Sequence, residues 1–240
     1  MKAFSALRTT VMIMLLTISM KGMASDSLNV DLSVGADLVN HYIWRGLMLS
    51  NSPSIQPSMS VSCKGFSFGS WASYSFNPAE FQEVDLFLTY SVGSFTIGVN
   101  DYYNPTDSMG KDDQYFNYGR RSSLHTFEPF ISFSDIGGTH FSASANLFAY
   151  GNDRDEDGKN MYSSYLELSY STSVNDYGLT LFGGGTLNKG YYASKAAIVN
   201  LGVSLSKEIK ISESFTIPCE GSFIVNPNSQ KVYLVFMVSF

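Results

Sequence analysis

The 240-residue sequence lacks several features that define familiar protein classes. Asp and Glu outnumber Lys and Arg by 21 to 15, so the chain has no basic excess with which to neutralise the phosphates of a nucleic acid. Beyond the first twenty or so residues, no apolar run approaches the roughly 20 residues that a membrane-spanning helix needs. Any insertion into a membrane must therefore use strands. Disulfide formation is limited to one pair of cysteines, Cys63 and Cys219.

The N-terminal segment has the pattern of an export signal. Lys2 and Arg8 precede an apolar run over 11–16, and Gly22-Met23-Ala24 supplies small residues before a cleavage point. We interpret 1–24 as a cleaved signal peptide and 25–240 as the mature protein. A membrane anchor is the alternative, but the apolar run has about half the length that spanning requires. Cleavage removes three basic residues and no acid, which changes the formal net charge from −6 to −9.

The mature chain alternates between apolar and other residues with period two. The final segment, KVYLVFMVSF, places an apolar residue at every second position from Val232 to Phe240. Successive side chains of an extended strand point to opposite faces, so one face of this segment is continuously apolar. The same alternation occurs over 28–38 and 197–205, and no segment shows a sustained helical period.

The alternation predicts twelve strands. Most run about ten residues, and at about 3.3 Å per residue and a tilt near 45° each climbs roughly 23 Å, the height of the apolar band of an outer-membrane barrel. The predicted strands are 28–39, 55–64, 66–76, 82–92, 95–102, 124–134, 139–149, 161–171, 178–186, 196–206, 213–224 and 231–240.

The connections between these strands alternate between tight and long. Lys64-Gly65, Gly93-Ser94 and 135–138 are tight, and the turns near Val174 and Glu208 are slightly looser. The long connections are 40–54, 103–123, 150–160 and 187–195. We therefore predict an all-β fold, a single closed antiparallel transmembrane barrel with short periplasmic turns and long extracellular loops. A secreted soluble β-sandwich or barrel, with its apolar face inside, is the alternative.

This barrel gives three further expectations. Cys63 and Cys219 would lie three strand spacings apart, about 14 Å, so we expect free thiols facing lipid, because a disulfide needs less than about 7 Å. Pro129 and Pro218 fall inside strands, where we expect bulges or strand ends. Aromatic residues should form two interfacial girdles. The outer one would comprise Tyr42, Trp44, Tyr102, Tyr103, Tyr150, Tyr191 and Tyr192, and the inner one Phe66, Phe133, Phe141, Tyr177 and Phe240.

The segment NHYIWRGLMLSNSPSIQPSMSVSCK over 40–64 carries a family motif. It resembles the Gcw-chp family, also called TorF-like porins, which opens with a Tyr-hydrophobic-aromatic-Arg-Gly motif, a Ser-rich loop and a step into the second strand that contains Gln. Here 42–46 and 54–56 match these features. The resemblance implies an outer-membrane barrel and, by the family's name, a pore. The aromatic residue Phe240 on the last strand also resembles the signal read by the outer-membrane assembly machinery.

The parity of the strands predicts an acidic lumen. If the alternation of the first strand continues, Arg45 faces the lumen near Glu83 and Asp85, and an Arg opposite carboxylates at a constriction would set ion selectivity. Arg45 could equally neutralise its neighbours in a closed, wet interior. The other predicted lumen charges are Asp31, Asp37, Glu128, Glu167 and Glu220, with Lys64 and Lys231 near the rims. Inward Trp71, Phe87, Phe130, Tyr165, Phe182 and Tyr233 predict a narrow or occluded pore.

We expect an outer-membrane protein of a Gram-negative bacterium that forms a narrow channel for small, cationic solutes. Its partners would be outer-membrane lipids and the assembly machinery, without nucleic acid and without a cofactor. The alternative is a structural or surface-interaction barrel with an occluded lumen, whose loops, notably 103–123, bind a partner.

Two motifs point to other chemistry. His140 and Ser142 share a face, as a base and nucleophile require, but no third group accompanies them, so we do not expect a lipid hydrolase or another enzyme. Asp153, Asp155 and Asp157 begin like a calcium loop, yet Ser164 stands where the ligating Glu would be. We expect a solvated acidic loop and no bound metal there.

Overall fold

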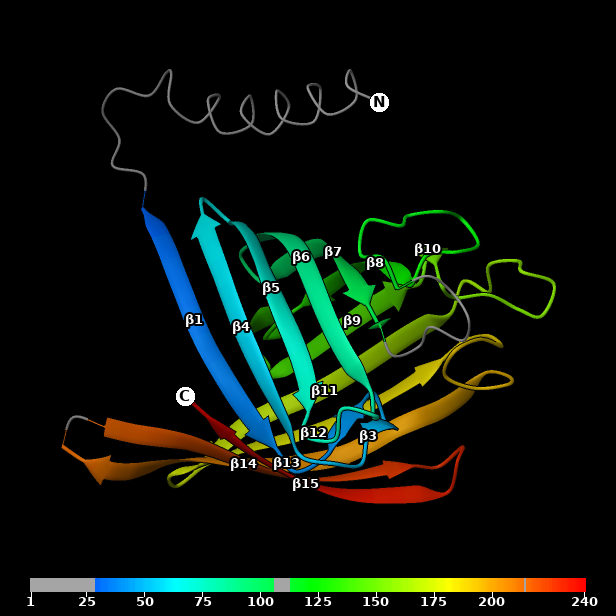
Figure 1. Ribbon diagram of the computed structural model, residues 1–240. Coiled ribbons are helices and arrows are strands. Elements are labelled where there is room, and N and C mark those ends of the chain that lie inside the picture. The colour runs from blue at the N-terminus through cyan, green and yellow to red at the C-terminus, as the bar shows by residue number, and fades with distance from the viewer. Residues whose placement is uncertain (1–28, 106–112, 214) are drawn as a thin grey trace, which may run out of the picture.

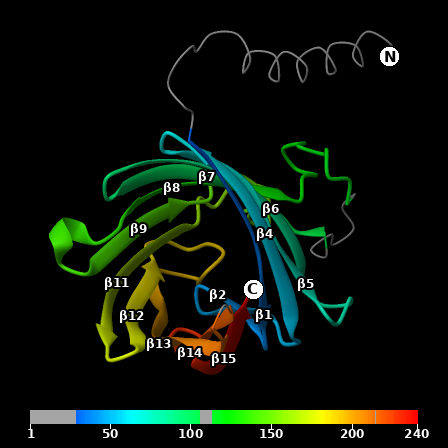
Figure 2. The same ribbon diagram turned by 90° about the vertical axis from the view of Figure 1, so that its left-hand side faces the viewer.

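The computed structural model describes residues 29–105, 113–213 and 215–240 and shows a closed barrel of antiparallel strands (Figures 1 and 2). The predicted signal peptide, 1–24, lies outside these ranges. Twelve long strands form the wall: β1 (Val30–Val39), β4 (Ser54–Cys63), β5 (Phe66–Ser75), β6 (Gln82–Val92), β7 (Phe95–Tyr103), β8 (His125–Phe133), β9 (Phe141–Leu147), β11 (Ser164–Val174), β12 (Tyr177–Thr186), β13 (Ala197–Ser212), β14 (Phe215–Asn226) and β15 (Lys231–Ser239). Three short strands, β2 (Tyr42–Trp44), β3 (Leu47–Ser50) and β10 (Tyr150–Gly151), and a 3₁₀ turn, η2 (Ile136–Gly138), complete the fold.

The wall closes because the first and last strands pair and because β8 also pairs with β9. Around the ring the order is β8, β7, β6, β5, β4, β1, β15, β14, β13, β12, β11 and β9. The seam between β1 and β15 is short, since Asp37, Leu38 and Val39 are the β1 residues in register with β15. The backbone of Ala36 also exchanges two hydrogen bonds with Phe240. The predicted twelve-stranded closed barrel is therefore confirmed.

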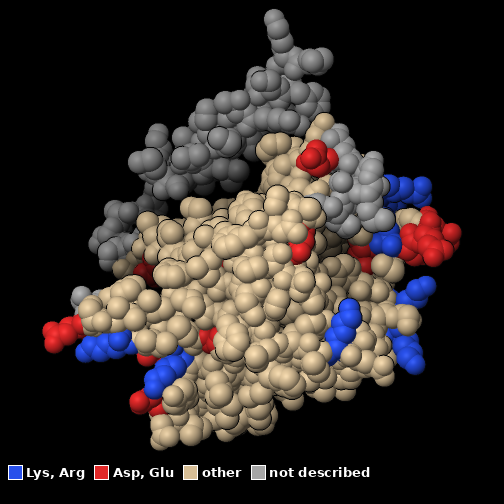
Figure 3. Space-filling model, turned by 60° about the horizontal axis from the view of Figure 1, so that its bottom comes forward, with Lys and Arg blue, Asp and Glu red and all other residues tan. Residues whose placement is uncertain are grey.

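The outer surface of the wall is apolar. Alternate residues of β1 and β15 face outward with large exposed fractions, for example Leu32 (79%), Val34 (83%) and Phe236 (55%). In Figure 3 most charged side chains of the displayed face lie toward the two ends of the molecule, with a broad band of few charges between them. No helix in the described ranges is long and apolar enough to cross a membrane.

The two rims differ as the sequence predicts, with one error in β13. Short turns join β4 to β5, β6 to β7 and β11 to β12, whereas 40–53, 104–124, 148–163 and 187–196 are long connections on the opposite rim. The turn expected near Glu208 is wrong, because β13 continues through that residue to Ser212 and pairs with β14 along this length, with a register shift after Lys210. Pairing of β12 with β13 ends at Ser206, so this hairpin projects beyond its neighbours (Figure 1). Charged residues in this projecting part interrupt the apolar alternation, and for that reason the sequence pattern predicted a turn there.

Both cysteines are free, as predicted. The irregularities expected at the two prolines lie on one side of each strand, because β8 stays in register with β7 through Pro129 and β14 stays in register with β13 through Pro218. On the other side of β8, three steps from Phe130 to Phe127 face four steps from Asn146 to Tyr150, so one extra residue lies opposite Pro129. The missing amides are tolerated for different reasons. Opposite Pro129 the ladder is interrupted in the partner strand, between β9 and β10, and Pro218 lies just before the first β14 residue that pairs with β15, Cys219.

The half of the lumen nearer the long connections is filled. The hairpin of β2 and β3 follows β1 and turns into the ring, where Figure 2 shows β2 surrounded by the wall. A buried cluster of Phe148, Tyr165, Tyr192, Ala193 and Val199 packs there with Trp44, Leu47, Tyr102 and Ala197. The predicted outer girdle is therefore largely wrong, since Trp44, Tyr102 and Tyr192 belong to this interior core. The predicted inner girdle fits, because Phe66, Phe133, Phe141, Tyr177 and Phe240 are exposed.

Candidate functional site

The inward hairpin is built around the turn Arg45-Gly46. Both residues have positive φ, 49° and 77°, which is the backbone of a two-residue hairpin turn. A side chain at position 46 would place its Cβ 2.0 Å from the carbonyl oxygen of Val199, so only glycine fits against β13. Asn226 Nδ2 donates to the Gly46 carbonyl at 3.0 Å. The tip of the hairpin is therefore docked on the wall formed by β13 and β14.

The Arg45 side chain ties the same tip to β8. Its Nη1 and Nη2 donate to the two carboxylate oxygens of Glu128 at 2.5 and 3.0 Å, and Nη1 also donates to Tyr192 Oη at 2.5 Å. The guanidinium lies 4.5 Å from the ring centres of both Trp44 and Tyr165, a cation–π distance. Since β8 and β13–β14 belong to different parts of the ring, the hairpin crosses the lumen.

Aromatic rings surround the crossing hairpin. The Trp44 ring stacks on Phe148 at 6.2 Å between centroids and meets Tyr102, Tyr191 and Tyr192 at 5.6 to 6.0 Å. Tyr102 also donates to Glu128 Oε2 at 2.7 Å. Apolar packing and buried hydrogen bonds thus hold the hairpin in one position.

The base of the hairpin is fixed by a loop carboxylate. Glu80, between β5 and β6, accepts hydrogen bonds from the backbone amides of Asn51 and Ser52 at 2.9 and 3.0 Å and from the Ser50 hydroxyl at 2.7 Å. On the other arm, Tyr42 donates to Glu83 at 2.8 Å. Each arm of the hairpin is therefore bonded to the β5–β6 region.

The predicted lumen charges are distributed unevenly. Arg45 pairs with Glu128, and neither Glu83 nor Asp85 forms an ion pair with it among the described residues. Glu83 and Asp85 are 5% and 8% exposed and lie on β6. Asp31 and Asp37 lie on β1, where Asp31 is exposed near the short-turn rim and Asp37 is half-buried. Glu167 and Glu220 are half-buried on β11 and β14.

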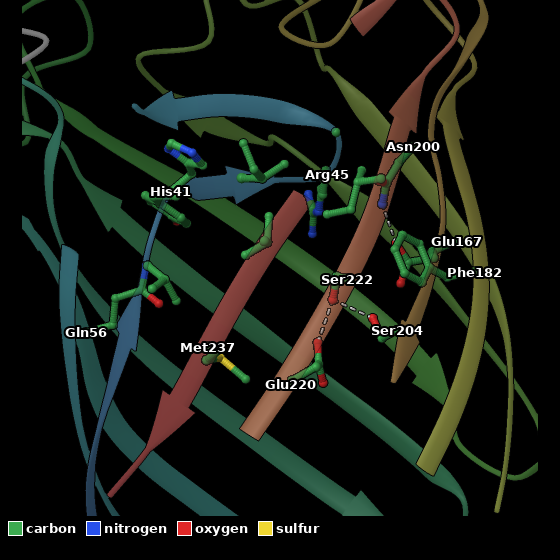
Figure 4. A pocket seen from close by; sticks show the side chains of 16 residues that line it. His41, Arg45, Gln56, Glu167, Phe182, Asn200, Ser204, Glu220, Ser222 and Met237 are labelled. Carbon is green, nitrogen blue, oxygen red and sulfur yellow. Dashed lines mark hydrogen bonds between the residues drawn. The ribbon is translucent and has the colours of Figure 1, made fainter. Parts of the chain in front are cut away.

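A cavity of about 320 Å³ lies between the hairpin and the part of the wall formed by β11–β15, β1 and β4 (Figure 4). We call it the vestibule. The hairpin contributes Ile43, Arg45 and Gly46 to it, and a second, smaller cavity of about 50 Å³ lies beside Trp44 and Glu83. The vestibule wall comprises Gln56, Glu167, Phe182, Asn200, Ser204, Glu220, Ser222, Ile224, Val235 and Met237. Asn200 was not predicted as a site residue, although it lies on the same face of β13 as Ser204, two alternations further along the strand.

Several inward aromatic side chains lie flat against the wall over glycines. Phe87 is in register with Gly69, Phe130 with Gly98, and Phe182 with Gly202. A Cβ at Gly202 would lie 2.3 Å from the Phe182 ring, and the other two glycines show the same close approach. The glycines therefore make room for rings that would otherwise project into the lumen.

The motifs considered for other chemistry are engaged elsewhere. Asp153 accepts from the Ser163 amide and hydroxyl at 2.8 and 2.6 Å, and its burial raises the pKa of this carboxyl. Asp155 accepts from the Lys159 amide, and Asp157 pairs with the Lys159 ammonium. No group of three His, Cys, Asp or Glu within the described ranges could hold a metal ion.

The candidate hydrolase pair lies at the short-turn rim. The Ser142 hydroxyl accepts from the Asp135 amide at 3.1 Å, and the His140 ring lies 6.0 Å from that of Tyr170.

Comparison with known proteins identifies a family. No curated protein matches the chain. A crystal structure of an outer membrane channel from Pseudomonas putida F1 aligns with a TM-score of 0.41 and 11% sequence identity, over 91% of this chain and 98% of that one. Residues 23–217 match the family described as bacterial protein of unknown function, Gcw_chp. The chain therefore belongs to the Gcw_chp family.

Proposed function

We propose that this protein is an outer-membrane barrel that forms a narrow channel for small cations, with the β2–β3 hairpin as its constriction. The observation that carries the proposal is the distribution of side chains across a closed wall. Large apolar residues are exposed outside the ring, while carboxylates line the inside. This distribution is the reverse of a soluble barrel and suits lipid outside with water inside.

The two unequal rims support an orientation. In bacterial barrels the short turns are periplasmic and the long loops extracellular. The hairpin would then lie toward the cell exterior, and the vestibule would open toward the periplasm. The exposed aromatics Phe66, Phe133 and Phe141 would lie at the periplasmic interface, where rings favour the headgroup level. Outer-membrane lipids and the assembly machinery, which would recognise the β15 end with Phe240, are the partners that follow.

The charge of the lumen favours cations. Glu167 and Glu220 line the vestibule, and Arg45 is already neutralised by Glu128. Charged rings and patches at a constriction set the sign of the permeant ion. A small cation would therefore be concentrated in this lumen and an anion would be excluded.

A planar-bilayer recording of the refolded mature chain tests the proposal. We expect small, reproducible unitary currents. Under a salt gradient, their reversal potential should have the sign that indicates selectivity for cations. Silence from protein whose folded state has been verified by circular dichroism would overturn it.

The second candidate is a barrel without conduction whose outer loops bind a partner. The hairpin and the aromatic cluster that fill the outer half of the lumen favour it. The connection 104–124 also carries Phe116 with an exposed fraction of 83%. The same recording separates the two candidates, because the occluded barrel gives no current.

A further inference from the structure

The vestibule has a carboxylate toward each end. Along β13, Asn200 is opposite Gly184, which is opposite Glu167, whereas Ser206 is opposite Glu220. The rows that carry the two glutamates are therefore six residues apart on β13, about 20 Å along the strand. Figure 4 shows Glu167 beside Asn200 and Glu220 at the other end, beyond Ser222 and Ser204.

Each carboxylate is fixed by the wall through one oxygen. Glu167 Oε2 accepts from Tyr165 Oη at 2.5 Å and from Asn200 Nδ2 at 3.3 Å. Glu220 Oε1 accepts from the Ser222 hydroxyl at 2.8 Å, and Ser222 is bonded to Ser204 at 2.7 Å. The second oxygen of each carboxylate accepts no hydrogen bond from the described residues. Both groups are thus held in place with one acceptor available to a ligand.

The buried side-chain amide of Asn200 adds an unsatisfied acceptor at the Glu167 end of the vestibule. Asn200 is 5% exposed and lines the vestibule. Its Nδ2 donates to Tyr165 and to Glu167, which fixes the orientation of the amide and leaves Oδ1 without a donor among the described residues. A buried acceptor without a partner costs free energy, so a ligand N–H donor at this end would be favoured.

The surface between the two ends is partly apolar. Phe182 of β12, Ile224 of β14, and Val235 and Met237 of β15 line it. The only Lys or Arg among the lining residues is Arg45, whose terminal nitrogens are bonded to Glu128 and Tyr192. The negative charge of Glu167 and Glu220 is therefore unbalanced by a lining cation.

We propose that the vestibule binds a linear polyamine, an aliphatic chain with an ammonium group at each end, an assignment that deepens the proposed cation channel and rests on it. One ammonium group bonds Glu167 near Asn200, and the other bonds Glu220 near Ser222. The methylene groups lie against Ile224, Val235 and Met237. A simple inorganic cation would use one carboxylate and leave the apolar surface unfilled.

Calorimetric titration of the detergent-solubilised mature chain at fixed ionic strength tests the site. Spermine, spermidine, putrescine and butylamine are the probes. Affinity should rise with the separation of the terminal ammonium groups, and spermine should bind about tenfold to hundredfold more tightly than butylamine, because it gains one more charge-assisted hydrogen bond. Similar affinity for butylamine and spermine would overturn the proposal without any variant.

Glu167→Gln and Glu220→Gln should each lower spermine affinity about tenfold or more while changing butylamine affinity much less. Asp176→Asn, in the β11–β12 turn outside the vestibule, is the matched control and should retain spermine binding. Equal loss of spermine affinity in all three variants would indicate that the overall negative charge of the barrel attracts spermine without a specific site. Calorimetry requires no current, so the two proposals can fail separately. A barrel that conducts potassium but does not bind spermine overturns the polyamine site alone. A barrel that binds spermine but gives no current overturns the channel alone.

Discussion

The guanidinium of Arg45 donates to both carboxylate oxygens of Glu128, although 83 residues separate them in the chain. Glu128 is 1% exposed, so this pair replaces water for both groups. The pair fastens the tip of the hairpin to β8 from within the lumen.

Replacing Arg45 by Gln should release the hairpin, because the buried Glu128 would lose its partner, at a cost of about 3–5 kcal/mol. We expect larger and noisier unitary currents and a lower unfolding midpoint in urea. The double variant Arg45→Gln with Glu128→Gln should recover much of the lost stability, since no unpaired charge remains. Equal stability of the wild type and the single variant would show that the pair does not hold the hairpin.

Substituting Ala for Gly46 should prevent the tip from docking. The added Cβ would meet the Val199 carbonyl and the backbone would be held at a φ of 77°, a strain of about 1–3 kcal/mol before the clash is counted. The measurement is acrylamide quenching of Trp44, read in a Trp71→Phe background, which should increase. Gly93→Ala is the control, because Gly93 also has positive φ but a Cβ there meets nothing within 4 Å.

A valine at position 202 should narrow the vestibule. Its side chain would occupy the space under the Phe182 ring and push that ring into the lumen. The same Cβ would lie 2.7 Å from the Phe223 carbonyl oxygen, so the folded state is verified by circular dichroism, and the single-channel conductance of the folded barrel should fall. Gly221→Ala, where the added Cβ would make an ordinary contact at 3.4 Å with Phe236, should leave conductance unchanged. Unchanged conductance in Gly202→Val would show that the vestibule is not on the permeation path.

The base of the hairpin should loosen in acid. Hydrogen bonds from the Ser50 hydroxyl and the Ser52 amide lower the pKa of Glu80 to about 2. Because the folded pKa is below the ordinary value, the stabilisation is fully present above about pH 4.5 and is lost as the pH falls through about 2. Glu80→Gln should reproduce the acid state at neutral pH.

Hydrogen exchange of the Asn51 and Ser52 amides is the measurement, since both donate to Glu80. Their protection should fall in Glu80→Gln and persist in Asp157→Asn, whose carboxylate is 74% exposed and pairs only with Lys159. Protection that survives Glu80→Gln would contradict the role of this carboxylate.

Neutralising Glu83 and Asp85 together should reduce cation preference. Both lie inside the ring beside the hairpin, and lumen carboxylates attract permeant cations. The reversal potential under a potassium chloride gradient should move toward zero in Glu83→Gln with Asp85→Asn. Glu156→Gln, in an outer loop, is the control. An unchanged reversal potential would remove these residues from the constriction.

The strands of the barrel wall were predictable from the sequence, whereas the hairpin and the side chains that fill the lumen were not. Alternation of apolar residues determined β6 to the residue, because one face of each strand meets a single environment. The same pattern failed after Val39, where the chain leaves the wall at Asn40 and the parity argument no longer applies. Short apolar triplets around Arg45-Gly46 were the available hairpin signal, but they were interpreted as loop and girdle.

The partner of Arg45 could not be found from parity. Glu83, Asp85 and Glu128 all face inward, and parity gives the face of a residue but not its height or its distance across the lumen. The choice of Glu128 depends on how far the hairpin reaches, which the docking of Gly46 on β13 and β14 determines. Asn226 and Tyr192 were missed for the same reason, since their roles exist only once the hairpin is in place.

The aromatic cluster around Trp44 gives this barrel a second source of cohesion. Burial of Phe148, Tyr165, Tyr192 and Val199 is complete or nearly so within the protein itself. Transfer from one detergent or bilayer to another changes the medium around the wall but does not change the surroundings of this buried cluster. This cluster thus follows the packing rules of water-soluble proteins, and amino-acid changes in it should alter stability in every detergent or bilayer.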